Sequence, residues 1–177
     1  MDLATARKSY YEVNHFPDDG GASLPYVPLK LGPLTLKVPN TAGRKVALAY
    51  HDLHHVVTGY QTTFRGESEI AAWELASGCE HYPAAVMYNL AGLAFGAIVW
   101  PRATARAWAL GRRTKNFYGR ALPDLLPREV TDAREELGLG KARVPVRAGD
   151  VASMIGYILT GPIRLAASAV KGRSRNR

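Results

Sequence analysis

The chain has 177 residues, and its 23 Lys and Arg outnumber 15 Asp and Glu, which gives a sequence pI near 9.8. This length predicts one domain with a substantial buried core. The formal net charge of +8 favours anionic partners such as lipid head groups, phosphates or nucleic acid. The single cysteine, Cys79, excludes an internal disulfide and is typical of a reducing compartment.

The first forty residues predict an N-terminal arm. Residues 1–11 suit a short helix. Residues 26–38 alternate apolar and polar side chains on both sides of Gly32-Pro33, which is typical of a hairpin or extended segment that packs on helices. Residues 1–30 lack the basic, apolar and small-residue succession of a secretory signal peptide.

Residues 44–58 (RKVALAYHDLHHVVT) have the apolar spacing of an amphipathic helix. With His51 at zero on the helical wheel, Asp52 lies at roughly 100° and His55 at roughly 40°. These three side chains therefore share one arc. His54 lies at roughly −60°, beside His51 but away from Asp52.

A glutamate follows this helix at a place where it can return to the histidines. Gly59 is a plausible helix stop, and Glu67 opens the next helical pattern, ESEIAAWELASGC. In an antiparallel pair, the start of the second helix lies beside the end of the first. Imidazole and carboxylate groups suit zinc, and also iron or manganese. An HExxH peptidase is discounted, because Asp52 stands where such enzymes have glutamate.

The segment His51-Asp52-x-x-His55, followed by eleven residues and then Glu67, resembles the HDxxH-x11-E signature of the Coq-four family of ubiquinone (coenzyme Q) biosynthesis. The continuation Thr58-Gly59-Tyr60 is similar to that family, and so is the later stretch 134–139 (REELGL). The similarity covers roughly residues 40–140. It implies an all-helical protein that associates with membranes.

The resemblance also implies a divalent metal, Zn²⁺ first, with Fe²⁺ or Mn²⁺ as alternatives. Its implied ligands are His51, Asp52, His55 and Glu67. The implied reaction removes the carboxylate at ring carbon C1 of a prenylated benzoate and introduces a hydroxyl. Asp52, Glu67 and His54 are the catalytic candidates, since Glu67 or His54 could move protons if not a ligand.

Residues 82–100 (YPAAVMYNLAGLAFGAIVW) carry no charge over 19 positions. This nearly reaches the length of a membrane span. We prefer a buried central helix, which could also form a wall for a lipid chain, because the length is marginal for a span. Glu69 and Glu74, just before this run, have no special spacing and are interpreted as solvated.

Residues 102–118 predict a basic amphipathic helix whose Trp108 and Phe117 supply aromatic surface, as in an interfacial membrane helix. Nucleic acid is a less favoured partner, because no recognised motif accompanies these charges. Tyr60 and Arg65 are candidate contacts for a substrate head group. Arg112 and Arg113 are candidate contacts for phosphate.

The carboxyl end continues the same pattern. Residues 141–149 are interpreted as a linker. An apolar helix over 150–170, broken by Gly161-Pro162, precedes a basic tail over 171–177, and such a combination can lie on an anionic membrane.

We therefore expect one all-α domain over residues 1–177. It comprises the arm over 1–40, a helical core over 41–140 that holds the metal motif, and this C-terminal part. The expected location is cytoplasmic, peripheral to the inner face of a bacterial inner membrane. The expected partners are a hydrophobic isoprenoid or aromatic molecule, the membrane surface, and a homodimer or biosynthetic complex. Two alternatives stay open: a non-catalytic lipid- or quinone-binding scaffold, and a relative recruited to bacterial secondary-metabolite tailoring.

Overall fold

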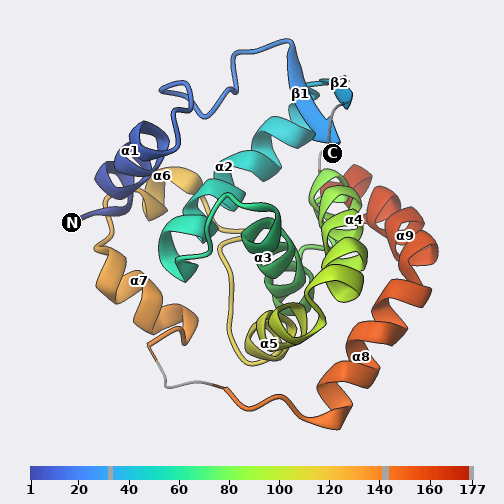
Figure 1. Ribbon diagram of the computed structural model, residues 1–177. Helices are drawn as coiled ribbons and strands as arrows, with labels where there is room; N and C mark the ends of the chain where they lie inside the picture. The colour runs from blue at the N-terminus through green and yellow to red at the C-terminus, as the bar shows by residue number, and fades with distance from the viewer. Residues whose placement is uncertain (32–33, 141–143, 176–177) are drawn as a thin grey trace.

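The computed structural model of the protein describes residues 1–31, 34–140 and 144–175. Over these residues the chain is mostly helical, which confirms the predicted all-α class (Figure 1). The elements are α1 Leu3–Val13, β1 Tyr26–Leu31, β2 Leu34–Pro39, α2 Ala42–Thr58, α3 Phe64–Ser77, α4 Pro83–Val99, α5 Pro101–Gly111, α6 Leu122–Leu125, α7 Val130–Leu137, α8 Ala148–Leu159 and α9 Gly161–Arg175. Parts of the predicted turn, linker and tail (residues 32–33, 141–143 and 176–177) lie outside the described residues.

Helices α2 and α3 begin and end where local chemistry permits. The hydroxyls of Thr41 and Thr63 accept hydrogen bonds from the first turns of α2 and α3. Gly59 ends α2 in the left-handed conformation at φ 76°, as predicted. The short turn that follows brings α3 back beside α2, and this reversal brings Glu67 to the histidine helix.

Helix α3 lies at the centre of the molecule and packs against α4 and α5 (Figure 1). Glycines allow this close approach. A Cβ atom added at Gly96 of α4 would lie 2.5 Å from the Ser68 Cβ, and one added at Gly111 of α5 would lie 2.5 Å from the Trp73 carbonyl oxygen. Any larger residue at these two positions would force the helices apart.

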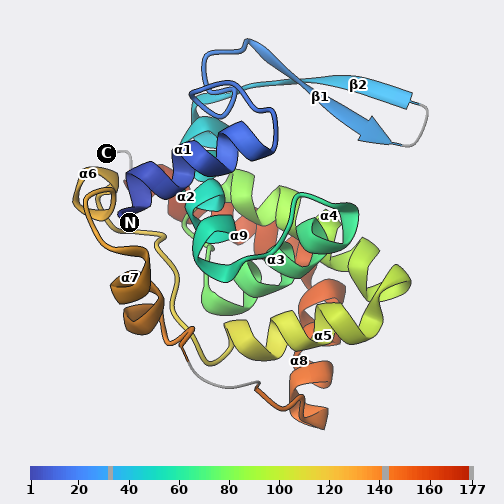
Figure 2. The same cartoon turned by 60° about the vertical axis from the view of Figure 1, so that its left-hand side comes forward.

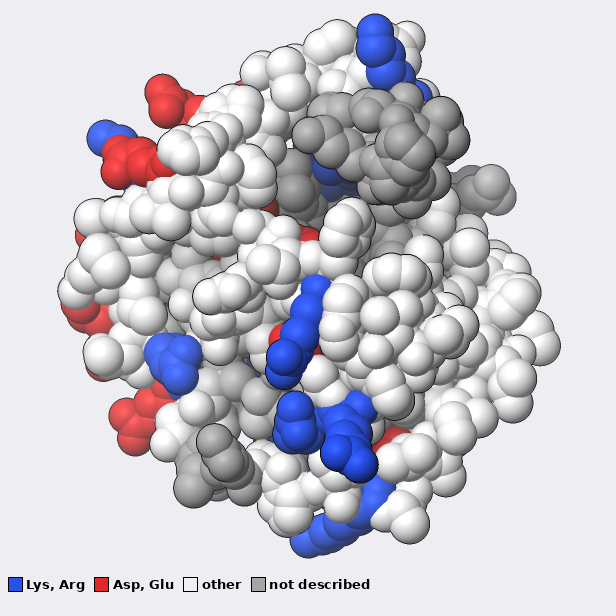
Figure 3. Space-filling model, viewed as in Figure 1, with Lys and Arg blue, Asp and Glu red and all other residues white. Residues whose placement is uncertain are grey.

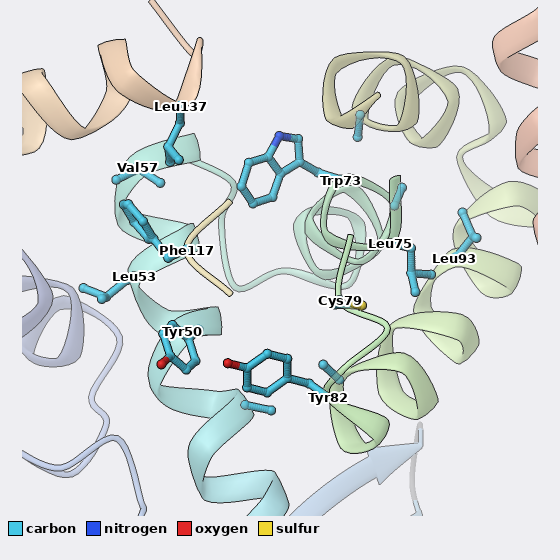
Figure 4. Close-up of a cluster of buried hydrophobic side chains, with 14 of the residues drawn as sticks. Tyr50, Leu53, Val57, Trp73, Leu75, Cys79, Tyr82, Leu93, Phe117 and Leu137 are labelled. Carbon is cyan, nitrogen blue, oxygen red and sulfur yellow. The ribbon is translucent and has the colours of Figure 1, made fainter. Parts of the chain in front are cut away.

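The hydrophobic core fills the space between α2, α3 and the loop after α5 (Figure 4). Trp73 and Phe117 are its largest fully buried side chains. Trp108 is 2% exposed. The prediction that Trp108 and Phe117 supply aromatic surface was therefore wrong. The basic helix ends at Gly111, and the following loop turns Phe117 inward.

The N-terminal arm is a short helix followed by a hairpin, as the sequence predicts. Strands β1 and β2 pair antiparallel, with Val27 opposite Val38. Figure 2 shows the hairpin at one end of the molecule, beyond the first turns of α2. Helix α1 packs against α2. The arm thereby covers the face of α2 that carries the metal motif.

Helix α4 is only partly the buried helix that we expected. Val86 and Leu93 are fully buried, whereas Phe95 is 46% and Ile98 81% exposed. No single described helix is long and apolar enough to cross a membrane. Helices α8 and α9 pass that test only as a pair bent by 73°. The bend follows Thr160, next to the predicted Gly161-Pro162 break.

Candidate metal centre and its pocket

Two histidines of α2 and one glutamate of α3 bring their ligand atoms to one point. The Nε2 atoms of His51 and His55 lie 3.1 Å apart. Glu67, in the first turn of α3, places its carboxylate oxygens 3.4 Å from each of these nitrogens. All three ligand atoms lie within 4.8 Å of one another. We call His51, His55 and Glu67 the metal triad.

The second nitrogen of each histidine is held by a hydrogen-bond acceptor. The Nδ1 atom of His55 lies 2.7 Å from the Tyr60 carbonyl oxygen, and the Nδ1 atom of His51 lies 3.1 Å from a Glu74 carboxylate oxygen. A carbonyl or carboxylate oxygen can only accept, so each Nδ1 carries a hydrogen. In the neutral rings, both Nε2 atoms therefore present lone pairs toward each other and toward Glu67.

Such a set of facing acceptors needs a cation between them. A proton meets this need in part. Burial alone would lower the pKa of His51, but attraction to Glu74 and a hydrogen bond with Glu67 raise it well above its ordinary value. Burial opposes ionisation of Glu67, yet the imidazoles of His51 and His55, which attract this carboxylate and donate to it when protonated, lower its pKa to about 2. Two imidazoles and a carboxylate are also the donor set that Zn²⁺, Fe²⁺ and Mn²⁺ accept, so these residues fit a divalent metal.

Asp52, the fourth predicted ligand, takes a different partner. The Tyr11 hydroxyl of α1 donates a 2.7 Å hydrogen bond to its carboxylate. Gly20 approaches the same carboxylate so closely that a Cβ there would lie 2.8 Å from Oδ2. Burial raises the pKa of Asp52. Its side chain also lines the pocket of the metal triad. Asp52 is therefore not part of the triad and lies beside it.

His54 faces the core. Its Nε2 atom accepts a 3.0 Å hydrogen bond from the Phe117 backbone N–H, and its Nδ1 atom lies 2.6 Å from Glu74. The interpretation of Glu74 as solvated was wrong, because its side chain is fully buried. Glu69 is partly buried and pairs with Arg65 at 3.6 Å. Burial lowers the pKa of His54, so this ring is kept neutral and inward-facing.

A largely apolar pocket of about 420 Å³ opens over the metal triad. The hairpin contributes Val27 and Val38 to its wall, and α4 contributes Tyr88 and Gly92. Further lining residues are Tyr10, Phe16, Arg44, Ala47, Leu48, Ala71, Ala85, Asn89 and Tyr118. The Tyr10 ring stacks on His55 with 5.4 Å between centroids. The pocket thus has aromatic and aliphatic walls and a polar floor.

Apart from the histidines, Arg44 is the basic side chain among the described residues that line the pocket. Its guanidinium donates a 2.9 Å hydrogen bond to the Asn40 side-chain oxygen. It also lies 5.8 Å from the centre of the Tyr88 ring. A fixed positive charge in an apolar pocket suits an anionic group on a hydrophobic ligand.

The four predicted substrate contacts lie elsewhere. Tyr60 lines a neighbouring pocket, and its carbonyl oxygen accepts a hydrogen bond from His55. The exposed Arg65 pairs with Glu69, as above. Arg112 and Arg113 both form ion pairs with Asp150 of α8, at 3.0 and 2.9 Å. None of these four side chains is among the described residues that line the main pocket.

No protein-family model, curated protein or solved structure matches this chain. The case for a metal centre therefore depends on the geometry of the triad and on its pocket. The resemblance to the Coq-four family stays a hypothesis carried by the motif residues.

Proposed function

We propose that this protein binds one divalent metal, foremost Zn²⁺, through His51, His55 and Glu67, and acts on a hydrophobic aromatic acid in the manner of the Coq-four family. One observation carries the proposal: three convergent ligand atoms lie at the floor of a largely apolar pocket. Three protein ligands are the number typical of catalytic zinc sites, whereas structural sites usually have four. This favours catalysis over a scaffold whose metal only braces the fold.

The pocket supports an aromatic substrate with an anionic group. Arg44 can hold a carboxylate by charge, and the Tyr10 and Tyr88 rings offer surfaces against which an aromatic ring can pack. The apolar wall from the hairpin and α4 offers a surface for the hydrophobic substituent of such a substrate. When bound, the metal would supply Lewis-acid stabilisation of charge on the substrate carboxylate or phenolate. The step expected from the Coq-four resemblance is loss of the ring carboxylate at C1 as carbon dioxide, after which a proton must take its place on C1. Asp52, which lines the same pocket, is the candidate donor of that proton.

The first experiment measures metal content by mass spectrometry in protein purified without chelators. We expect about one metal ion per chain, and loss of that metal in a His51→Ala, Glu67→Ala double variant. The exposed His81 lies outside the pocket, so His81→Ala is the matched control and should keep its metal. Wild-type protein without metal would refute the proposal.

A second experiment tests the substrate class. The metal-loaded protein is mixed with a prenylated 4-hydroxybenzoate labelled at its carboxyl carbon, and released carbon dioxide is counted under air and under argon.

Arg44→Met should weaken binding of this acid more than binding of the prenylated phenol that lacks the carboxylate. Equal effects on both ligands would contradict the assigned role of Arg44.

We propose in addition that the protein docks on an anionic membrane, from which a hydrophobic substrate could enter. Four exposed side chains, Phe64, Phe95, Ile98 and Val99, form an apolar patch, with 6.4 Å between the Phe64 and Phe95 ring centroids. Figure 3 shows Lys and Arg side chains gathered in the middle and lower part of one face, beside a broad uncharged area. Apolar surface next to basic residues is typical of peripheral membrane proteins.

Vesicle sedimentation tests the docking surface. Phe95→Ser with Ile98→Ser should reduce binding to vesicles that contain phosphatidylglycerol, because it removes apolar surface at the centre of the patch. Val146→Ser changes an exposed apolar residue outside this patch and should bind as wild type does. Equal binding by all three proteins would refute docking through the patch.

A further inference from the structure

Glu74 is a buried carboxylate that links the metal triad to the core. It lies on α3, two turns after Glu67, and its side chain is fully buried between α2 and α4. A buried carboxylate is costly unless hydrogen bonds replace its water shell. The hydrogen bonds that Glu74 accepts must therefore offset the cost of burying its carboxylate.

Four donors converge on this one carboxylate. Oε1 receives the Nδ1–H groups of His51 and His54, at 3.1 and 2.6 Å. Oε2 receives the Asn89 side-chain amide and, at 2.9 Å, the Tyr118 hydroxyl. A carboxylate has about four lone-pair sites, so this set of donors saturates it. The carboxylate is consequently fixed from α2, α4 and the loop after α5.

The donor directions determine which nitrogen of His51 faces the pocket. The neighbouring His54 accepts the Phe117 backbone N–H at Nε2, so its hydrogen is at Nδ1 and points to Glu74. His51 shares the same acceptor oxygen and must likewise donate from Nδ1. Its Nε2 atom is thereby left bare and directed at His55 and Glu67.

We propose that Glu74 is the positioning residue of the metal centre, holding His51 by its Nδ1–H group so that Nε2 faces the metal. This inference rests on the proposed metal binding. A carboxylate that accepts the free N–H of a ligating histidine fixes the ring orientation and raises its basicity. His54, Asn89 and Tyr118 hold the carboxylate itself, and the Phe117 backbone N–H in turn holds His54, so the loop after α5 supports the site through both Phe117 and Tyr118.

The test compares zinc affinity with folding stability in Glu74→Gln. We expect the zinc Kd to rise by about 10- to 100-fold, which is the usual effect of losing such a partner. Leu53→Ala is the matched control, because Leu53 is a fully buried residue of the same histidine helix that lies outside the pocket. It should lower stability and leave the zinc Kd unchanged. The absorption bands of the Co²⁺-substituted protein should shift in Glu74→Gln and not in Leu53→Ala.

Imidazole nitrogen NMR on the wild-type protein keeps the proposal testable if Glu74→Gln does not fold. The zinc-loaded protein should show His51 and His54 with hydrogen at Nδ1 and with zinc on Nε2 of His51. Hydrogen or metal at the opposite nitrogen of His51 would overturn the inference, as would a folded Glu74→Gln protein with wild-type affinity and spectrum. Wild-type protein that binds no zinc would refute the metal centre itself, which is a distinguishable result.

Discussion

Metal binding should release one proton near neutral pH, and the proton should come from His51. The pKa of His51 lies well above its ordinary value, so the metal-free ring is protonated at pH 7. A metal on Nε2 must displace that proton. Glu67, whose pKa is about 2, is already ionised and contributes none. The affinity for zinc should therefore rise about tenfold, or about 1.4 kcal/mol, for each pH unit until His51 deprotonates.

Isothermal titration calorimetry measures this directly. Zinc is titrated into metal-free protein at pH 6.5, 7.0 and 7.5, in pairs of buffers that differ in ionisation enthalpy. The dependence of the observed heat on buffer gives the number of protons released. A value near one is expected at pH 6.5 and 7.0. A value near zero, with an affinity independent of pH, would refute the argument that facing lone pairs hold a proton in the metal-free site.

Three further predictions concern stability and the turn that sets the site. Gly66→Ala would place a Cβ 2.0 Å from the Gln61 carbonyl oxygen, so we expect this variant to displace Glu67 and to weaken zinc binding. Its control is Gly43→Ala, on α2, where an added Cβ would meet open space. Gly43→Ala should raise the free energy of unfolding, measured in urea, by about 0.5–1 kcal/mol. Gly59→Ala keeps the space but forces alanine to φ 76°, and should cost about 1–2 kcal/mol in the same assay. The pKa of Glu67 is lowered from 4.5 to about 2, so the ionised carboxylate stabilises the metal-free protein above pH 4.5, and this contribution is lost as pH falls toward 2. The difference in unfolding free energy between wild type and Glu67→Gln should therefore shrink over that range. Because the Glu67 side chain is 42% exposed, solvent screening keeps this difference small.

The sequence predicts the part of the site that depends on helical spacing. His51 and His55 are one turn apart on α2, and Gly59 ends that helix where expected, so the return of Glu67 follows from local rules. The hairpin and the helical class follow from alternation and apolar periodicity in the same way. These features need only the order of residues along one or two neighbouring elements.

The remaining features depend on contacts between distant elements. The Tyr11 hydroxyl engages Asp52 from α1, and this contact joins residues 41 positions apart. Phe117 follows a basic stretch, and only the turn after Gly111 directs it into the core. The role of Glu74 could have been predicted from the sequence. Glu74 follows Glu67 by seven residues, so the two side chains lie within about 20° of each other on the helical wheel. Because Glu74 follows the motif on the same helical face, that spacing could have identified it as a partner of the histidines.

The last prediction follows from how the fold is held around the site. Glu74 joins α2 through His51 and His54, α4 through Asn89, and the loop after α5 through Tyr118. These bonds hold the helices together without any metal, so removing zinc with a chelator should leave the far-ultraviolet circular dichroism unchanged. The loss in stability should equal only the binding linkage, about 4.1 kcal/mol at a free zinc concentration of a thousand times Kd. A protein that unfolds on chelation would instead have a structural metal, and the catalytic proposal would be wrong.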